Sequence, residues 1–280
     1  MRRLAYILLL VLTACSMAVP DDADPQVVLS FQPVVSPMTK AVDMTGLTVG
    51  VSGWTMKHGL GWIYGSETEE FLTCSRVVPG PEEKWYLEDM KLWPSSRERL
   101  TVIGYAPYEQ AQGCDEIYGV RFDDVNVLET QPLLYYTEPQ ADLVKTVSGG
   151  MVSLPLQHAL CQMEFKVRSR VAPEEQVSVK RITLDSACYT GDFRSLPQPK
   201  WTASGLVRDV EFSVQQPRLM IPQQLSSSVT VEFDYTNAAG LAIPLVLKTA
   251  VMEKELYPGQ HYTFVLSVGV DDVKFLSEIL

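Results

Sequence analysis

The stretch Tyr262-Thr-Phe-Val-Leu-Ser-Val-Gly-Val270 decides the fold class of this 280-residue chain. Every second side chain in it is aromatic or aliphatic, and a period of two places all of these groups on one face of an extended strand. The same alternation recurs along the chain and predicts further β-strands. These stretches are Leu47–Trp54, Thr101–Tyr105, Met151–Leu156, Ala159–Val167, Val177–Leu184 and Val229–Tyr235.

Short turn sequences separate the predicted strands. Ser226–Ser228, Asn237–Gly240 and Pro258-Gly259 combine residue types that favour tight turns. No window carries an apolar stripe with helical spacing over more than about two turns. The sequence therefore predicts an all-β protein built from antiparallel β-sandwiches, because alternating β-α units would need helices between the strands.

The length of the chain fits two sandwiches in tandem. Residues 138–150 are mostly polar, lack a strand pattern and end in Gly149-Gly150, so we place the domain boundary there. The expected domains are an N-terminal β-sandwich over residues 26–148 and a C-terminal β-sandwich over residues 149–280.

The N-terminus has the features of an export signal. Arg2 and Arg3 precede an apolar run, Leu4–Leu12, that is too short to span a bilayer. Leu12-Thr13-Ala14-Cys15 resembles the bacterial lipobox, in which a signal peptidase cuts before the cysteine and the thiol receives a lipid. A plain secretory signal is the alternative. We expect a signal peptide over residues 1–14, a lipid on Cys15 and a short acidic tether over residues 15–25.

Charge and hydropathy limit the partners of the chain. The net charge of −11 argues against nucleic acid, because phosphate binding needs a basic surface. No second apolar stretch approaches the ~20 residues of a membrane-spanning helix. The lipid on Cys15 would therefore be the anchor, and we expect the protein on the surface of the cell outer membrane.

Four cysteines follow Cys15. Their spacing is wide and includes no CxxC pair, which argues against a zinc site and against a dense disulfide scaffold. An oxidising compartment permits one or more disulfides, and buried free thiols are the alternative. If a disulfide forms, the pair we expect is Cys74–Cys114. The remaining two are Cys161 and Cys188.

The sequence gives no sign of catalysis or of a cofactor. The three histidines are far apart along the chain and none lies in a local nucleophile or metal motif. Asp123-Asp124 and Asp271-Asp272 lack the surrounding loop of a calcium site. We therefore expect a protein that is not an enzyme, with no catalytic residues, no metal and no cofactor. The histidines are His58, His158 and His261.

Several segments, taken together in order and spacing, resemble the fimbrillin family of Bacteroidales, whose members are subunits of donor-strand pili and related lipoproteins. This resemblance implies two transthyretin-like β-sandwiches in tandem and a fimbrial structural or accessory subunit with a role in adhesion. The segments are Gln26–Phe31, Thr39–Val42, Lys84–Tyr86, Trp93-Pro94, Leu100–Pro107, Leu133–Tyr136, Val152–Leu160, Phe165–Val167, Val179–Leu184, Leu219–Gln223 and Tyr257–Tyr262.

The resemblance also implies a route of assembly. A protease removes the first strand of the precursor, and a strand from the next subunit fills the groove by β-strand addition. The candidate cleavage site is Lys40-Ala41, where polymerising members usually have arginine in place of the lysine. Val27, Leu29 and Phe31 alternate along the strand that would be removed and form the candidate plug. A permanent N-terminal edge strand is the alternative.

A second function remains open from the sequence. The chain is also compatible with an outer-membrane-anchored module that binds a glycan or a host protein and does not polymerise. The expected partners are therefore other fimbrial subunits, the outer membrane through the lipid, and a host protein or glycan.

Overall fold

The computed structural model describes residues 26–36, 46–57, 69–94, 98–115, 117–137 and 149–279. Within these ranges the chain forms strands, turns and two short 3-10 turns, Pro81–Glu83 and Tyr108–Gln110, and no α-helix. No helix in the described part has the length and apolar character needed to cross a membrane. The all-β prediction is confirmed.

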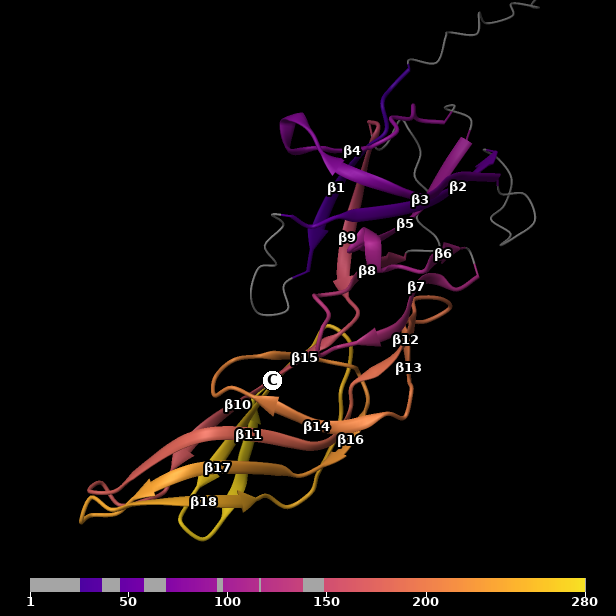
Figure 1. The fold of residues 1–280 in the computed structure, drawn as a ribbon. Helices are drawn as coiled ribbons and strands as arrows, with labels where there is room; N and C mark the ends of the chain where they lie inside the picture. Colours follow the sequence, from indigo (N-terminus) through magenta and orange to yellow (C-terminus); the bar gives the residue numbers. More distant parts are fainter. Residues whose placement is uncertain are drawn as a thin grey trace, which may run out of the picture.

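Seven strands close into a barrel in the order β1-β4-β3-β2-β5-β8-β9, at the upper end of the molecule in Figure 1. The alternating sequence of β9 buries every second side chain from Val152 to His158, which is why this segment lines the barrel. The strands are β1 (Ser30–Val35), β2 (Val49–Lys57), β3 (Glu69–Pro79), β4 (Trp85–Leu87), β5 (Glu98–Ala106), β8 (Leu134–Thr137) and β9 (Met151–His158).

Two four-stranded sheets form a sandwich at the other end of the chain (Figure 1). Their facing side chains make one core, in which Phe165 meets Phe212 edge to face and also packs against Phe264. The first sheet is β15 (Arg218–Met220), β10 (Cys161–Ser169), β20 (His261–Val268) and β21 (Val273–Ile279). The second is β14 (Val207–Phe212), β11 (Gln176–Cys188), β17 (Val229–Thr236) and β18 (Ala242–Lys248).

The strands are not all antiparallel. β10 and β20 pair in parallel over eight residues, from Gln162–His261 to Ser169–Val268, and β1 and β9 also run parallel. Long returns of the chain separate the members of both pairs, so no hairpin forces them to be antiparallel. The barrel and one sheet of the sandwich are therefore mixed, which corrects the antiparallel prediction for these two pairs.

A third sheet connects the barrel to the sandwich. β7, from the first half of the sequence, pairs with β12, from the second half. β9 follows Gly149-Gly150 directly and belongs to the barrel, so the chain passes to the sandwich only after His158. The division at residues 148 and 149, and the transthyretin-like form of each half, stay predictions. The sheet is β13 (Lys200–Ala203), β12 (Thr190–Arg194), β7 (Gly119–Asn126) and β6 (Gly113–Asp115), and β16 (Gln224–Ser227) pairs separately with β19 (Met252–Glu255).

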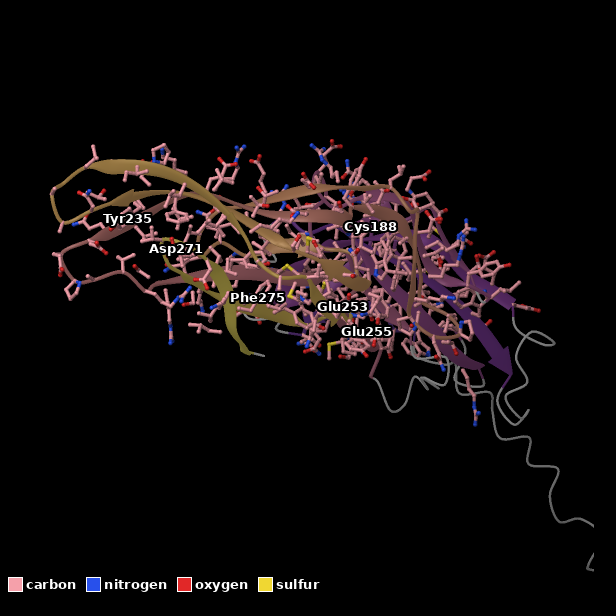
Figure 2. The ribbon with its side chains drawn as sticks, turned by 90° about the horizontal axis from the view of Figure 1, so that it is seen from below. Cys188, Tyr235, Glu253, Glu255, Asp271 and Phe275 are labelled. Atoms are coloured by element: carbon pink, nitrogen blue, oxygen red, sulfur yellow. The ribbon has the colours of Figure 1, made fainter. Side chains whose placement is uncertain are left out.

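β11 runs the length of the sandwich and carries a bulge near the barrel. Figure 2 shows Tyr235, which pairs with Val177 of β11, at the far end of the sandwich, and Cys188, the last residue of β11, near the barrel. The register shifts between Leu184 and Ala187, and Ser186 has a φ of +53°.

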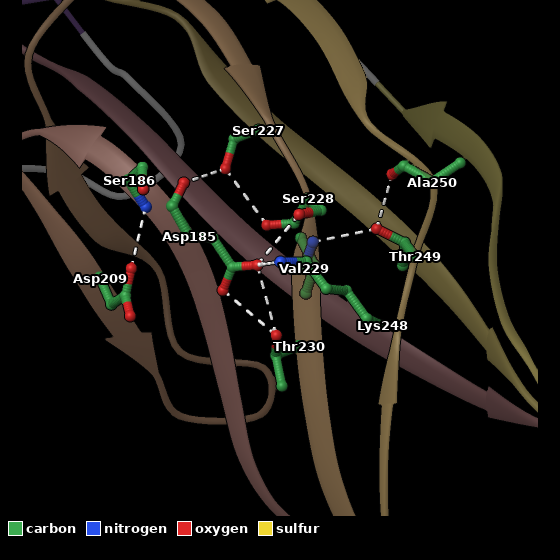
Figure 3. A network of polar contacts seen from close by, with 10 residues as sticks. All are labelled: Asp185, Ser186, Asp209, Ser227, Ser228, Val229, Thr230, Lys248, Thr249 and Ala250. Atoms are coloured by element: carbon green, nitrogen blue, oxygen red, sulfur yellow. Dashed lines mark hydrogen bonds and ion pairs between the residues drawn. The ribbon is translucent and has the colours of Figure 1, made fainter.

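Polar contacts around Asp185 hold this bulge (Figure 3). The Asp185 carboxylate accepts hydrogen bonds from the hydroxyls of Ser228 (3.0 Å) and Thr230 (3.2 Å) and pairs with the Lys248 ammonium at 2.8 Å. The N–H of Ser186 donates to Asp209 Oδ1 at 3.0 Å. Because Asp209 lies in β14 and Thr230 in β17, the bulge is held by both strands that pair with β11.

Candidate functional site

β1 completes the barrel by lying between β9 and β4. All six of its residues pair in parallel with Met151–Leu156 of β9. Against β4 it is antiparallel, and only Ser30 and Phe31 have partners there. An isolated bridge from Val28 to Leu92 continues this side toward the start of the strand. We call the surfaces of β4, residues 91–93 and β9 that hold this strand the β1 seat.

Backbone hydrogen bonds fix β1 on both sides of the seat. Ser30 and Ser36 donate their N–H groups toward β9, whereas Leu29 donates toward the β4 side. Because successive N–H groups alternate between the two sides, Pro33 lacks an N–H on the β4 side, where pairing has already ended at Phe31. Proline is tolerated at such a position because no ladder bond is lost. The bonds are Ser30 N–H to Gly150 O (3.0 Å), Ser36 N–H to Leu156 O (3.0 Å), Leu29 N–H to Lys91 O (3.0 Å) and Trp93 N–H to Val27 O (2.7 Å).

Two apolar side chains, one just before β1 and one in it, enter the barrel core. Leu29 and Phe31 are 0% exposed and belong to the same cluster as Val51, Trp93 and Leu154. Burying each of them contributes roughly 1.5–3 kcal/mol by transfer energies. The alternation that marked these positions in the sequence therefore places them inside the barrel.

Gly150, just before β9, makes room for the residues at the start of β1. It has a φ of +86°, and a Cβ there would lie 2.2 Å from Cγ1 of Val27. The half-buried Val27 side chain thus occupies the space that the glycine leaves. The buried Ser30 hydroxyl also donates to Gly150 O at 3.2 Å.

Sequence reasoning missed part of this site. It identified the alternating residues of the first strand and predicted a strand over Met151–Leu156, but not the parallel pairing of the two or the contacts of residues 91–93 and Ser30 with them. Gly149-Gly150, at the start of β9, has the composition of a linker and was interpreted as one. Lys40, Ala41 and Cys15 lie outside the described residues.

The structure brings Cys74 and Cys114 to the same side chain. The Ser52 hydroxyl lies 3.8 Å from the Cys74 sulfur and accepts the Cys74 N–H at 2.9 Å. Burial raises the pKa of the Cys114 thiol to about 12, and the same Ser52 hydroxyl interacts with that thiol. All four described cysteines are free thiols in this structure, and the Cys74–Cys114 disulfide stays a prediction.

The other predicted groups do not converge on a reactive centre. His158 ends β9 inside the protein, and burial lowers the pKa of its imidazole. Asp124 donates its N–H to Asp192 Oδ1 at 2.9 Å, and Asp123 lies 3.8 Å from the Arg194 guanidinium. Among the described residues, no group of three or more His, Cys, Asp or Glu side chains could hold a metal ion.

Comparison with known proteins identifies one matching family. A sequence model of a protein family described as fimbrillin-like matches residues 48–279. No curated protein matches the chain.

Solved structures share this fold at low identity. A fimbrial protein from Bacteroides vulgatus ATCC 8482 is 13% identical, with a TM-score of 0.65 over 90% of this chain and 98% of that one. A candidate cell adhesion protein from Bacteroides uniformis ATCC 8492 is 12% identical, with a TM-score of 0.57 over 91% of this chain and 97% of that one. A candidate cell adhesion protein from Bacteroides ovatus ATCC 8483 is 10% identical, with a TM-score of 0.55 over 91% and 96%.

Two neighbouring glycines test the shape of the seat. Alanine at Gly149 or Gly150 must adopt a left-handed backbone, which costs about 1–2 kcal/mol. Gly149 has no atom within 4 Å of the added Cβ, whereas the Cβ at Gly150 displaces Val27. We therefore expect Gly150→Ala to lower the free energy of unfolding by more than Gly149→Ala, as measured by denaturant titration. Equal losses would show that Val27 is not seated against Gly150.

The cysteine pair is tested by oxidation. We expect glutathione disulfide to convert the Cys74 and Cys114 thiols to one protein disulfide, with release of two molecules of glutathione. Peptide mass spectrometry without reduction should identify the cross-linked peptide. Cys161→Ser should leave the cross-link intact, and Cys114→Ser should leave Cys74 as a mixed disulfide with glutathione. Absence of the cross-link in the unsubstituted protein would contradict the pairing.

Proposed function

The chain belongs to the fimbrillin-like family, and we propose that it is a structural or accessory subunit of a fimbria that assembles by β-strand addition. The observation that carries this proposal is the β1 seat. β1 is a short extended strand, its inward side chains fill the barrel core, and it is the first strand of the described chain.

Removal of β1 would leave a groove suited to a second strand. The C=O groups of Gly150, Leu156 and Lys91 would lose their donors, and the space of Leu29 and Phe31 would open to water. Unpaired backbone groups beside an apolar groove favour binding of another extended segment with alternating apolar side chains. The main-chain hydrogen bonds would supply affinity, and the alternation would fix the register.

The N-terminal segment supplies the steps before assembly. Lipid on Cys15 would hold the precursor at the outer membrane, with the barrel and sandwich exposed at the cell surface. Cleavage after Lys40 would separate β1 from the rest of the chain, because β1 ends at Val35. The vacated seat would then accept the donor strand of the next subunit.

Cleavage and plug are tested by two variants. Lys40→Ala should block processing by a trypsin-like protease and keep the protein monomeric, whereas Lys200→Ala, at another exposed lysine, should still be processed to SDS-resistant ladders. Combined replacement of Val27, Leu29 and Phe31 by serine should lower the melting temperature, because Leu29 and Phe31 each lose about 1.5–3 kcal/mol of burial and the half-buried Val27 loses less. Val34→Ser, at a side chain that is 50% exposed on the same strand, is the control.

If the triple variant melts like the parent and Lys40→Ala still forms ladders, strand addition does not operate in this chain. The protein would then be an anchored binding module that keeps β1 permanently.

The anchor is tested by Cys15→Ser. Without the thiol no lipid can be attached, so we expect the protein to move from the outer-membrane fraction to the soluble fraction on cell fractionation. A Cys188→Ser variant should remain with the membrane. Retention of Cys15→Ser in the membrane pellet with unchanged mobility would rule out this lipidation site.

A further inference from the structure

A cavity of about 470 Å³ opens on the sandwich side of the molecule, away from the β1 seat. Its walls are the end of β11, β13, the start of β14 and β16, none of which pairs with β1. This volume is within the range of pockets that hold small ligands. We propose that the cavity binds a neutral saccharide, with Trp201 as its aromatic platform.

Trp201 is held in place before any ligand arrives. Its indole N–H donates to the Ala159 carbonyl at 2.6 Å, and its ring packs against Phe193 with centroids 5.4 Å apart. The half-buried side chain lines the cavity with its remaining surface. Because an aromatic face is electron-rich, it attracts the polarised C–H groups on the flat side of a sugar ring.

Polar side chains line the same cavity as Trp201. Ser186 and Gln224 line the cavity and are exposed, and the Ser186 hydroxyl and the Gln224 amide make no hydrogen bond to any described residue. The Ser226 hydroxyl donates to Glu253 Oε1 at 2.5 Å. The cavity thus offers free donors and acceptors for the hydroxyl groups of a sugar, arranged beside an apolar ring.

The bulge in β11 sets the position of Ser186. Its N–H is tied to Asp209 Oδ1, as Figure 3 shows, and its left-handed backbone turns the residue out of the regular strand. The Gln223 amide stiffens the opposite wall, because it accepts from Cys188 N–H at 3.1 Å and donates to Cys188 O at 2.9 Å. These bonds join β11 to the segment before β16, so the cavity does not depend on a ligand for its shape.

The charge around the cavity favours an uncharged ligand. None of the residues that line it is charged, and two of them, Ser186 and Ser226, are hydrogen-bonded to the carboxylates of Asp209 and Glu253. These two carboxylates would repel an anionic ligand such as a sialylated or phosphorylated sugar. A purely apolar ligand would leave the polar rim without partners. A neutral sugar carries no charge and has hydroxyl groups for the polar rim, so it fits the cavity on both counts.

The test uses the full chain and four probes: the methyl glycosides of glucose, galactose and mannose, and sialyllactose. We expect saturation-transfer NMR signals from at least one neutral glycoside and from none of the sialic acid protons. Gln224→Ala should weaken that binding about threefold to tenfold, the effect of losing one hydrogen bond. Gln176→Ala, at an exposed glutamine on the far end of β11, should leave the affinity unchanged.

A second variant addresses the platform. Trp201→Leu should abolish the saturation-transfer signal, and its melting curve shows whether the fold survives. If Trp201→Leu does not fold, Gln224→Ala tests the proposal instead, because Gln224 is exposed and its replacement should leave the fold intact. The proposal is overturned if no neutral glycoside gives a signal at its highest soluble concentration. It is equally overturned if Gln224→Ala binds like the parent protein, or if sialyllactose binds more tightly than the neutral probes.

Discussion

The pairing of β1 with β9 is the constraint on which the barrel depends. A barrel removes the exposed edges of its sheet only when the last strand is in place, and here that strand comes first in the sequence. Its N–H groups satisfy carbonyls on both sides, and its side chains fill the centre of the core. The stability of the N-terminal half is therefore linked to one short segment that a single cut upstream of β2 would detach.

The connection between the barrel and the sandwich follows from a second constraint. Phe193 of β12 packs against Phe122 of β7 and against Tyr135 of β8, with centroids 5.9 and 4.9 Å apart. Strands from both halves of the sequence thus share one apolar cluster. A strand that enters the β1 seat would bind to the barrel. Because this cluster joins the barrel to the sandwich, both would be linked to the next subunit together.

The sequence predicted the parts of the fold that depend on side-chain alternation. The buried positions of Leu29 and Phe31 and the strands of the sandwich agree with it. Cys74 and Cys114 both lie beside Ser52, and the disulfide between them stays a prediction. The parallel pairs β1–β9 and β10–β20 were not predicted, because alternation is the same in parallel and antiparallel strands. Gly149-Gly150 was interpreted as a linker, since composition does not reveal that its positive φ angles turn the chain directly into β9. The Trp201 cavity was also missed, because its walls come from four strands that are separated in the sequence.

The two proposed sites lie on different elements, and this separation has a consequence for binding. The β1 seat would connect one subunit to the next, while the cavity at Trp201 would stay open in every subunit, because no strand that lines it takes part in the connection. A shallow, uncharged sugar site gains little affinity alone. Repeated along a polymer, the same weak site raises the effective concentration of each further contact, so that avidity can exceed the single-site affinity by about 10²–10⁴. Weak recognition at Trp201 and strong association at β1 would therefore complement each other in one subunit, and only the second would require the loss of a strand.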